Sequence, residues 1–155
     1  MVTEGTRQQP FRRLSRGVLN MDWFDENSDG KKVYLAGPIF RCTDEESKNW
    51  RSLAKELLEL PFIDPMDRDY RGVENQLFRQ IVNEDKAEIL KCWWMLAYCP
   101  RPSFGTPMEV LFGYERGLHV VTVSETPCTS PWLKYHSQYV SRSVEEACDY
   151  INSRI

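Results

Sequence analysis

The chain has 155 residues, a hydrophobic content of 41% and a formal net charge of -3 at pH 7. This length and apolar fraction suffice for one domain with a packed core and leave no room for a second domain. The slight negative charge gives no general attraction to nucleic acid or to an anionic membrane, so neither is expected as a partner.

Five cysteines are spread along the chain without a Cys-x-x-Cys pair: Cys42, Cys92, Cys99, Cys128 and Cys148. Their odd number, and the absence of an apolar signal-peptide segment near Met1, predict reduced thiols in a cytoplasmic protein. A zinc site is not expected, because neither His119 nor His136 has ligand-like spacing with a cysteine. No apolar run approaches the length of a membrane span.

Residues 1–30 differ in composition from the remainder of the chain. Arginines come first and acidic residues follow, with Trp23 and Phe24 between the acids. No period of 2 or 3.6 persists there, which predicts a flexible arm before a domain over residues 31–155. Trp23 and Phe24 are candidates for docking on the domain or on a second subunit.

The domain opens with an apolar run over residues 32–37, which predicts a buried strand that ends in a Gly-Pro turn. A helix is predicted from there to about Glu59, capped by Thr43 or Asp44, because apolar residues recur at helical spacing along one face. That face is expected to belong to the core.

A short second strand is predicted over residues 60–64, and the polar stretch 66–72 indicates a loop long enough to form one wall of a pocket. Residues 74–91 predict a helix with an apolar stripe. The stripe consists of Leu77, Phe78, Ile81, Val82, Ile89 and Leu90. Asp85 lies one turn beyond Ile81, and a carboxylate beside a buried stripe is unusual.

A continuous apolar run over residues 92–98 is typical of a central parallel strand covered on both faces. A helix over 106–116 that ends at Gly117 and a strand over 118–123 follow, and Ser143 opens a terminal helix with a capping box. Strands that alternate with such helices predict an α/β fold. We expect one doubly wound, mainly parallel sheet with helices on both faces, of the Rossmann or flavodoxin-like type.

The junction between the 92–98 run and the next helix is the expected ligand site, since open α/β sheets bind ligands at the carboxyl ends of strands. The junction ends in Thr106-Pro-Met-Glu109. With Thr106 as helix cap and Pro107 in the first position, Glu109 completes a capping box, which is a structural role. The same position suits a catalytic carboxylate, because the helix dipole and free N–H groups hold it ionised. The two roles do not exclude each other.

Three segments stand out by their order and spacing: Val33-Tyr-Leu-Ala-Gly-Pro38, Val82-Asn-Glu-Asp85 and Pro102-Ser-Phe-Gly-Thr-Pro-Met-Glu109, with Gly113 and Arg116-Gly117 before a valine-rich strand. Together they resemble the nucleoside 2-deoxyribosyltransferase family, from Lys31 to the C-terminus. Family members cleave the N-glycosidic bond of a 2'-deoxynucleoside through a glutamate nucleophile and pass the deoxyribosyl group to another base. Related hydrolases cleave nucleoside 5'-monophosphates with water.

The resemblance implies a role for each matching residue. Glu109 matches the nucleophile, Asp85 the aspartate that acts on the base side, and Tyr34 the first-strand tyrosine near the catalytic carboxylate. The substrate site would include Gly37, Ser103, Gly105, Thr106 and Met108. The implied partners are a nucleoside or nucleotide and a nucleobase, with no metal or organic cofactor.

This chemistry explains the residue types. C1' develops oxocarbenium character, so it needs an anion on one face and proton delivery to the leaving base on the other. Glu109 would supply the anion, and Asp85 the proton if the apolar stripe raises its pKa. The alternative for Asp85 is a surface aspartate paired with Lys86 or Arg79. Tyr34 would hydrogen-bond Glu109, and its alternative is strand packing.

Two positions depart from the transferase pattern. Trp93 stands where many transferases have an aspartate, and Ser103 stands where some have a second one. The nucleotide hydrolases have a serine at the second position, where it helps to hold the 5'-phosphate. Ser103, the N–H groups around Gly105, and Arg41 or Arg101 would form such a phosphate site at a helix N-terminus. The alternative for Ser103 is a turn serine. Deoxyribosyl transfer is thus the first prediction, hydrolysis of 5'-monophosphates the second, and a non-catalytic nucleotide-binding sensor the third.

Residues 132–140 are ambiguous in secondary structure. Trp132, Tyr135 and His136 there resemble a family segment near the subunit interface, although an aromatic core is the favoured interpretation. The family's members are oligomers, which implies a homo-oligomer here. Cys99 is not expected to be a nucleophile, because no histidine is placed by the sequence to activate it.

Overall fold

The computed structural model describes residues 31–125 and 130–155. The predicted arm with Trp23 and Phe24, and Cys128, lie outside these ranges. The elements are β1 (Val33–Ala36), α1 (Asp44–Leu57), β2 (Phe62–Ile63), the 3-10 helix η1 (Pro65–Arg68), α2 (Glu74–Ile89), β3 (Trp94–Tyr98), α3 (Gly105–Glu115), β4 (His119–Val123), α4 (Pro131–Tyr135), β5 (Tyr139–Ser141) and α5 (Val144–Asn152). The ambiguous stretch 132–140 thus contains most of α4 and the start of β5.

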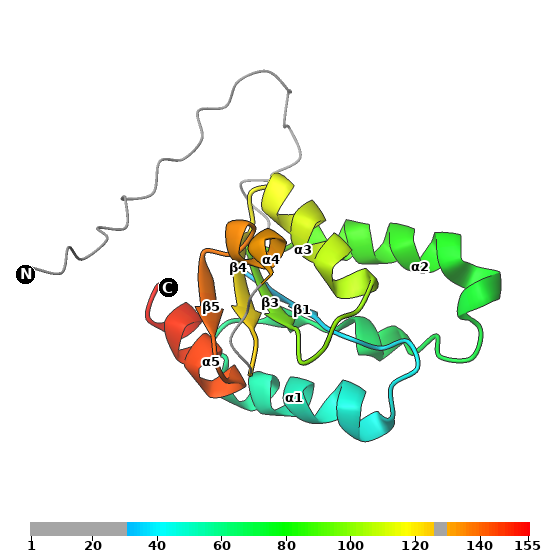
Figure 1. Cartoon of the computed structure of the whole chain (residues 1–155), viewed down its shortest axis with the longest axis horizontal. Coiled ribbons are helices and arrows are strands. Elements are labelled where there is room, and N and C mark those ends of the chain that lie inside the picture. The colour runs from blue at the N-terminus through cyan, green and yellow to red at the C-terminus, as the bar shows by residue number, and fades with distance from the viewer. Residues whose placement is uncertain (1–30, 126–129) are drawn as a thin grey trace, which may run out of the picture.

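The five strands form one parallel sheet in the order β2-β1-β3-β4-β5. Helices α1 and α5 cover one face and α2 and α3 the other (Figure 1). This confirms the predicted doubly wound α/β fold, and the strand order is the flavodoxin-like one. In that order the direction in which strands are added to the sheet reverses between the parallel neighbours β1 and β3, so the loops that leave these two strands flank the expected ligand site.

Alternate residues of the strands enter two separate cores. Val33 and Leu35 pack with α1 and α5, whereas Tyr34 and Ala36 pack with residues of α2 and α3 such as Ile89 and Val110. All four strand residues have no exposed surface. The strand period of two therefore directs the Tyr34 side chain toward α3, which carries Glu109.

The helix starts follow capping rules at two of the predicted sites. Thr43 caps α1, where its hydroxyl accepts from the Glu46 N–H while the Glu46 carboxylate accepts from the Thr43 N–H, a complete capping box. Ser143 caps α5 by accepting from the Glu146 N–H. The Glu146 carboxylate accepts from the N–H of Arg142. The reciprocal half of the predicted box is therefore displaced by one residue.

The apolar stripe of α2 is not buried as predicted. Phe78 is 55% and Val82 48% exposed, and Ile89 is the one residue of the helix that reaches the core. The reason is that α2 is long and its first turns extend beyond the edge of the sheet (Figure 1). Trp132 and Tyr135, for which an aromatic core was favoured, are also exposed. Sequence periodicity identified these apolar faces but not what covers them.

Gly37 ends β1 directly beside the indole of Trp50, where a Cβ atom would lie 2.4 Å from the Trp50 Cζ2 atom. Gly37→Ala is therefore expected to cost about 1–3 kcal/mol of unfolding free energy through overpacking. Thermal unfolding measures this. Gly105→Ala is the matched control, since nothing lies within 4 Å of a Cβ atom there. Equal melting temperatures for the two variants would contradict the packing argument.

Candidate active site

Glu109 and Tyr34 meet between α3 and the sheet. The Tyr34 hydroxyl donates a hydrogen bond to Glu109 Oε1 at 3.0 Å, which is the contact that the sequence predicted. The capping box predicted for Thr106 and Glu109 is wrong. Helix α3 begins at Gly105, its cap position is Phe104, and that cap has no side-chain hydrogen bond. The Glu109 carboxylate therefore points to β1 and not back to the helix start.

The environment of Glu109 favours its protonated form. Burial, followed by the negative charge of Asp85, raises the pKa of Glu109 to about 8. The hydrogen bond from Tyr34 and the positive charge of Arg51 act in the opposite direction. Burial also raises the pKa of Tyr34, and the Glu109 charge adds to this effect. The Glu109 carboxyl group, held by Tyr34, thus has a pKa near neutrality, a property typical of catalytic carboxyl groups.

Asp85 is held by a residue that the sequence analysis did not single out. The residue is Arg68 of η1. Its Nη2 atom lies 3.0 Å from Asp85 Oδ1 and 2.5 Å from Glu88 Oε2, and its Nη1 atom lies 2.7 Å from Glu84 Oε2. Burial raises the pKa of Asp85, while Arg68 lowers it. One guanidinium thus faces three carboxylates of α2, and Asp85 is the one whose charge also acts on Glu109.

A second cation, Arg51 of α1, lies beneath the site. Its Nη2 donates to the Gly37 carbonyl oxygen at 3.0 Å, and its Nε lies 3.1 Å from Asp64 Oδ1. The Arg51 side chain is 1% and that of Asp64 3% exposed. Arg51 therefore fixes the end of β1 and provides the positive charge that lowers the pKa of Glu109.

A titration tests this description of the carboxyl groups. In a ¹³C NMR experiment the Glu109 carboxyl group is expected to titrate with a pKa of about 8. Asp85→Asn removes a neighbouring negative charge, so the Glu109 pKa should fall, whereas Arg51→Met removes a positive charge and should raise it. A glutamate in a short unstructured peptide is the reference. A Glu109 titration that overlays that of the peptide would contradict the proposed environment.

A hollow of about 170 Å³ lies at the carboxyl ends of β1 and β3. It is lined by Pro38, Cys42, Glu46, Tyr98, Pro100 and Arg101. Arg101 borders it with a half-exposed guanidinium, whose Nη1 lies 3.6 Å from Glu46 Oε1 and whose Nη2 donates to Cys42 Sγ at 3.2 Å. This is the topological switch point at which flavodoxin-like folds bind ligands.

None of the other predicted substrate residues lines this hollow, and they differ in exposure. Gly37 is buried at the end of β1, Ser103 is partly buried, and Gly105 is exposed at the start of α3. Met108 is 71% exposed. Thr106 is buried, and its Oγ1 atom has no hydrogen-bond partner among the described residues. Arg41 is exposed and has a positive φ of 56°.

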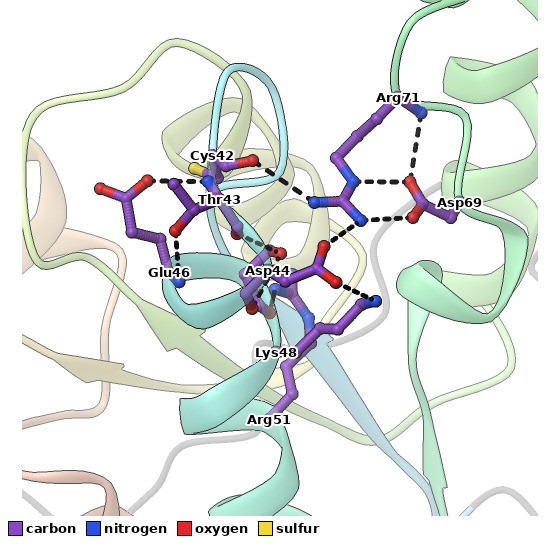
Figure 2. Close-up of polar contacts among 9 residues, drawn as sticks. Cys42, Thr43, Asp44, Glu46, Lys48, Arg51, Asp69 and Arg71 are labelled. Atoms are coloured by element: carbon purple, nitrogen blue, oxygen red, sulfur yellow. Dashed lines mark hydrogen bonds and ion pairs between the residues drawn. The ribbon is translucent and has the colours of Figure 1, made fainter.

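Arg71 connects the loop after β1 and the start of α1 with the segment before α2 through ion pairs and a hydrogen bond. Its Nη2 lies 2.6 Å from Asp44 Oδ1 and 2.6 Å from Asp69 Oδ2, and its Nη1 donates to the Cys42 carbonyl oxygen at 3.4 Å. Figure 2 shows this guanidinium between the two carboxylates. The loop predicted over 66–72 thus lies against the start of α1, and its first half, which forms η1, supplies Arg68 to the α2 carboxylates.

Comparison with solved structures agrees with this topology. The chain matches a conserved protein from Enterococcus faecalis V583 with a TM-score of 0.58 and 16% identity, over 81% of this chain and 99% of that one. It matches the 2-deoxyribosyltransferase from the psychrotolerant bacterium Bacillus psychrosaccharolyticus with a TM-score of 0.55 and 18% identity, over 77% of this chain and 91% of that one. Its fold resembles that of a 2-deoxyribosyltransferase. No protein-family model matches the chain, and no curated protein matches its sequence.

The likeness to the 2-deoxyribosyltransferase supports the predicted resemblance at the level of the fold. Within residues 31–125 and 130–155, no three His, Cys, Asp or Glu side chains form a group that would hold a metal ion. None of the helices described in these ranges is long and apolar enough to cross a membrane.

Sequence reasoning missed Arg51 and Arg68. Arg51 carried a signal, because it lies within the apolar face of α1, one residue after Trp50 and three before Ala54. An arginine beside such residues requires a buried partner. Arg68 lies in a charged stretch with no period, where nothing distinguishes it from its neighbours.

Proposed function

We propose that this protein cleaves the N-glycosidic bond of 2'-deoxynucleosides and transfers the deoxyribosyl group to another nucleobase. The observation that carries the proposal is the hydrogen bond of 3.0 Å from Tyr34 to Glu109, with the charge of Asp85 close enough to raise the pKa of Glu109. Two interacting carboxyl groups and an orienting phenol are what a double displacement at C1' requires.

In the proposed reaction an oxygen of ionised Glu109 forms a bond to C1' as the bond from C1' to the base nitrogen breaks. The electron pair leaves with the base, which takes up a proton, and Asp85 is the proposed donor. A second base then attacks C1' from the opposite side, gives up its N–H proton to the ionised Asp85 and releases Glu109, so the overall outcome is retention. Tyr34 orients the carboxylate, and Arg68 orients Asp85.

The second candidate function is the hydrolysis of deoxynucleoside 5'-monophosphates by water. It is favoured by Arg101, whose half-exposed guanidinium borders the hollow at the switch point, and by the buried Thr106 hydroxyl in the first turn of α3. A phosphate group suits such a site, because guanidinium groups and helix N-termini both bind it. Ser103 and the backbone around Gly105 would complete the site. Arg101→Gln would then raise the KM for monophosphates and leave the KM for nucleosides unchanged.

The test is chromatography of the purified protein with each deoxynucleoside plus a different free base, and separately with each deoxynucleoside 5'-monophosphate alone. A new nucleoside that the native protein forms and the Glu109→Gln variant does not form supports the transferase. Free base released only from monophosphates supports the hydrolase. If no product forms with any substrate while ligand binding is retained, the chain is a nucleotide-binding sensor, and the enzymatic proposal is wrong.

We also propose that the exposed apolar face of α2 and α3 binds a second copy of the chain. Phe78 and Val82 of α2, Phe104 before α3 and Met108 of α3 are all exposed. The two helices are neighbours, since Lys86 of α2 lies over the ring of Phe112 of α3 at 5.3 Å. A patch of this kind marks an interaction surface. Met108→Glu is expected to lower the molar mass seen in sedimentation equilibrium, whereas Leu57→Glu on α1 should not. A monomeric native chain would contradict this proposal.

A further inference from the structure

A second hollow, of about 360 Å³, lies at the end of the sheet opposite the candidate active site. It is lined by Lys31, Leu60, Trp93, Trp94, His119, Tyr150, Arg154 and Ile155. Trp94 begins β3 directly after Trp93, His119 begins β4, and Tyr150 lies near the end of α5. The hollow is therefore at the amino ends of the strands, and no residue assigned to the reaction contributes to it.

The walls of this hollow are aromatic. Trp94 is almost buried and its ring centroid lies 4.8 Å from that of His119, while Tyr150 stacks on Tyr139 at 4.2 Å. Trp93 is 46% exposed. Fixed aromatic rings around a concave space of this size favour a planar, aromatic ligand, which can stack without ordering the walls further.

The charged side chains at the rim have one sign. Lys31 and Arg154 line the hollow, and no aspartate or glutamate is among the lining residues. Neither cation forms an ion pair with another residue in the described ranges. The Arg154 guanidinium lies 4.6 Å from the centroid of the Tyr150 ring, so its positive charge is placed at the edge of the aromatic wall. Burial lowers the pKa of His119, which leaves this imidazole neutral at pH 7.

We propose that this hollow is a binding site for a small planar aromatic anion, in which Trp93 stacks on the ring and Arg154 and Lys31 bind the carboxylate or phosphate. In a chain whose formal net charge is -3, two cations without a described acidic partner beside an aromatic cavity provide local charge complementarity for such a ligand. The proposal does not depend on the proposed function, because the two sites share no residue.

Three matched probes test the proposal with the full chain. Indole-3-acetate has both the ring and the charge, indole-3-acetamide has the ring alone, and cyclohexylacetate has the charge without the aromatic ring. Binding is followed by ¹⁹F NMR of protein that contains 5-fluorotryptophan, with the Trp93 resonance assigned by Trp93→Phe. Indole-3-acetate is expected to shift the Trp93 resonance and to bind at least about fivefold more tightly than either other probe. This preference should shrink at high salt.

Arg154→Gln separates charge recognition from stacking. It should remove the preference for the acid over the amide and leave the weak binding of the amide in place. Arg142→Gln is the matched control, since Arg142 is exposed at the other end of α5. The proposal is overturned if the Trp93 resonance does not move with indole-3-acetate. It is equally overturned if the acid and amide bind alike, or if the exposed Trp132 responds in place of Trp93. Insensitivity of Trp93 because a second copy of the chain covers the hollow would also overturn it.

Discussion

Glu109→Gln is expected to lower the rate of glycosidic cleavage by at least about a thousandfold, because an amide cannot form the covalent bond to C1' that the proposed reaction requires. The substitution preserves the shape of the side chain, and a glutamine oxygen can still accept the hydrogen bond from Tyr34. Substrate binding should therefore change little. The effect is measured as the rate constant for cleavage in single-turnover experiments, and Glu115→Gln at the end of the same helix is the control.

Glu109→Gln is also expected to change how the stability of the fold depends on pH. The pKa of Glu109 is raised in the folded state from an ordinary value of 4.5 to about 8, so the stability that this group contributes is complete below pH 4.5 and is lost as the pH rises through 8. Glu109→Gln does not titrate. Near pH 8 this variant should therefore have a melting temperature equal to or above that of the native chain. Near pH 4 any such gain in melting temperature should disappear. A strongly destabilised variant that also lost substrate binding would show that Glu109 has a structural role.

Asp64→Asn is expected to cost about 3–5 kcal/mol of unfolding free energy, which would make it one of the most damaging single changes to the charged groups. It leaves the guanidinium of Arg51 buried without its carboxylate, since Arg51 Nε lies 3.1 Å from Asp64 Oδ1. Lys55, whose Nζ lies 2.6 Å from Asp64 Oδ2, loses its partner too, but it is partly exposed and remains hydrated. Urea denaturation gives the free energy from the transition midpoint.

Asp44→Asn is the control for this prediction, because Asp44 also faces two basic residues, Lys48 and Arg71, but its side chain is exposed. Exposed pairs contribute about 0–1 kcal/mol, so a small effect is expected there. The double variant Arg51→Met with Asp64→Leu should recover much of the loss, since it removes both buried charges. If Asp64→Asn and Asp44→Asn have similar midpoints, the buried pair does not stabilise the fold.

The elements that the sequence predicted well are those whose cause is local. The apolar run predicted over 92–98 contains the central parallel strand β3 (Trp94–Tyr98), because a continuous apolar run is soluble only when both faces are covered. Gly117 ends α3 with a φ of 86°, a conformation that glycine adopts without strain. Thr43 caps α1 because its hydroxyl and the Glu46 carboxylate are near each other in any helix that begins there.

The predictions that were wrong depended on contacts between distant residues. Thr106 and Glu109 match a capping box as well as Thr43 and Glu46 do, yet the cap of α3 is Phe104, two residues before Thr106, and the phenol of Tyr34 competes for the Glu109 carboxylate. A local pattern does not reveal such a competitor. The stripe of α2 was predicted to be buried for a similar reason, since periodicity reports that a face is apolar but not whether the sheet extends beneath it.

The amino-acid sequence by itself determined the alternation of strands and helices and the parallel sheet, because both depend on hydrophobic period and short segments. Its resemblance to the nucleoside 2-deoxyribosyltransferases gave Glu109, Asp85 and Tyr34 as the candidate catalytic residues. Only the tertiary structure decided how these residues are charged. Arg51, Arg68 and Asp64 reach the site from α1, η1 and the end of β2, and their effect on a carboxyl group depends on distance and burial. Both quantities are fixed only when the chain has folded.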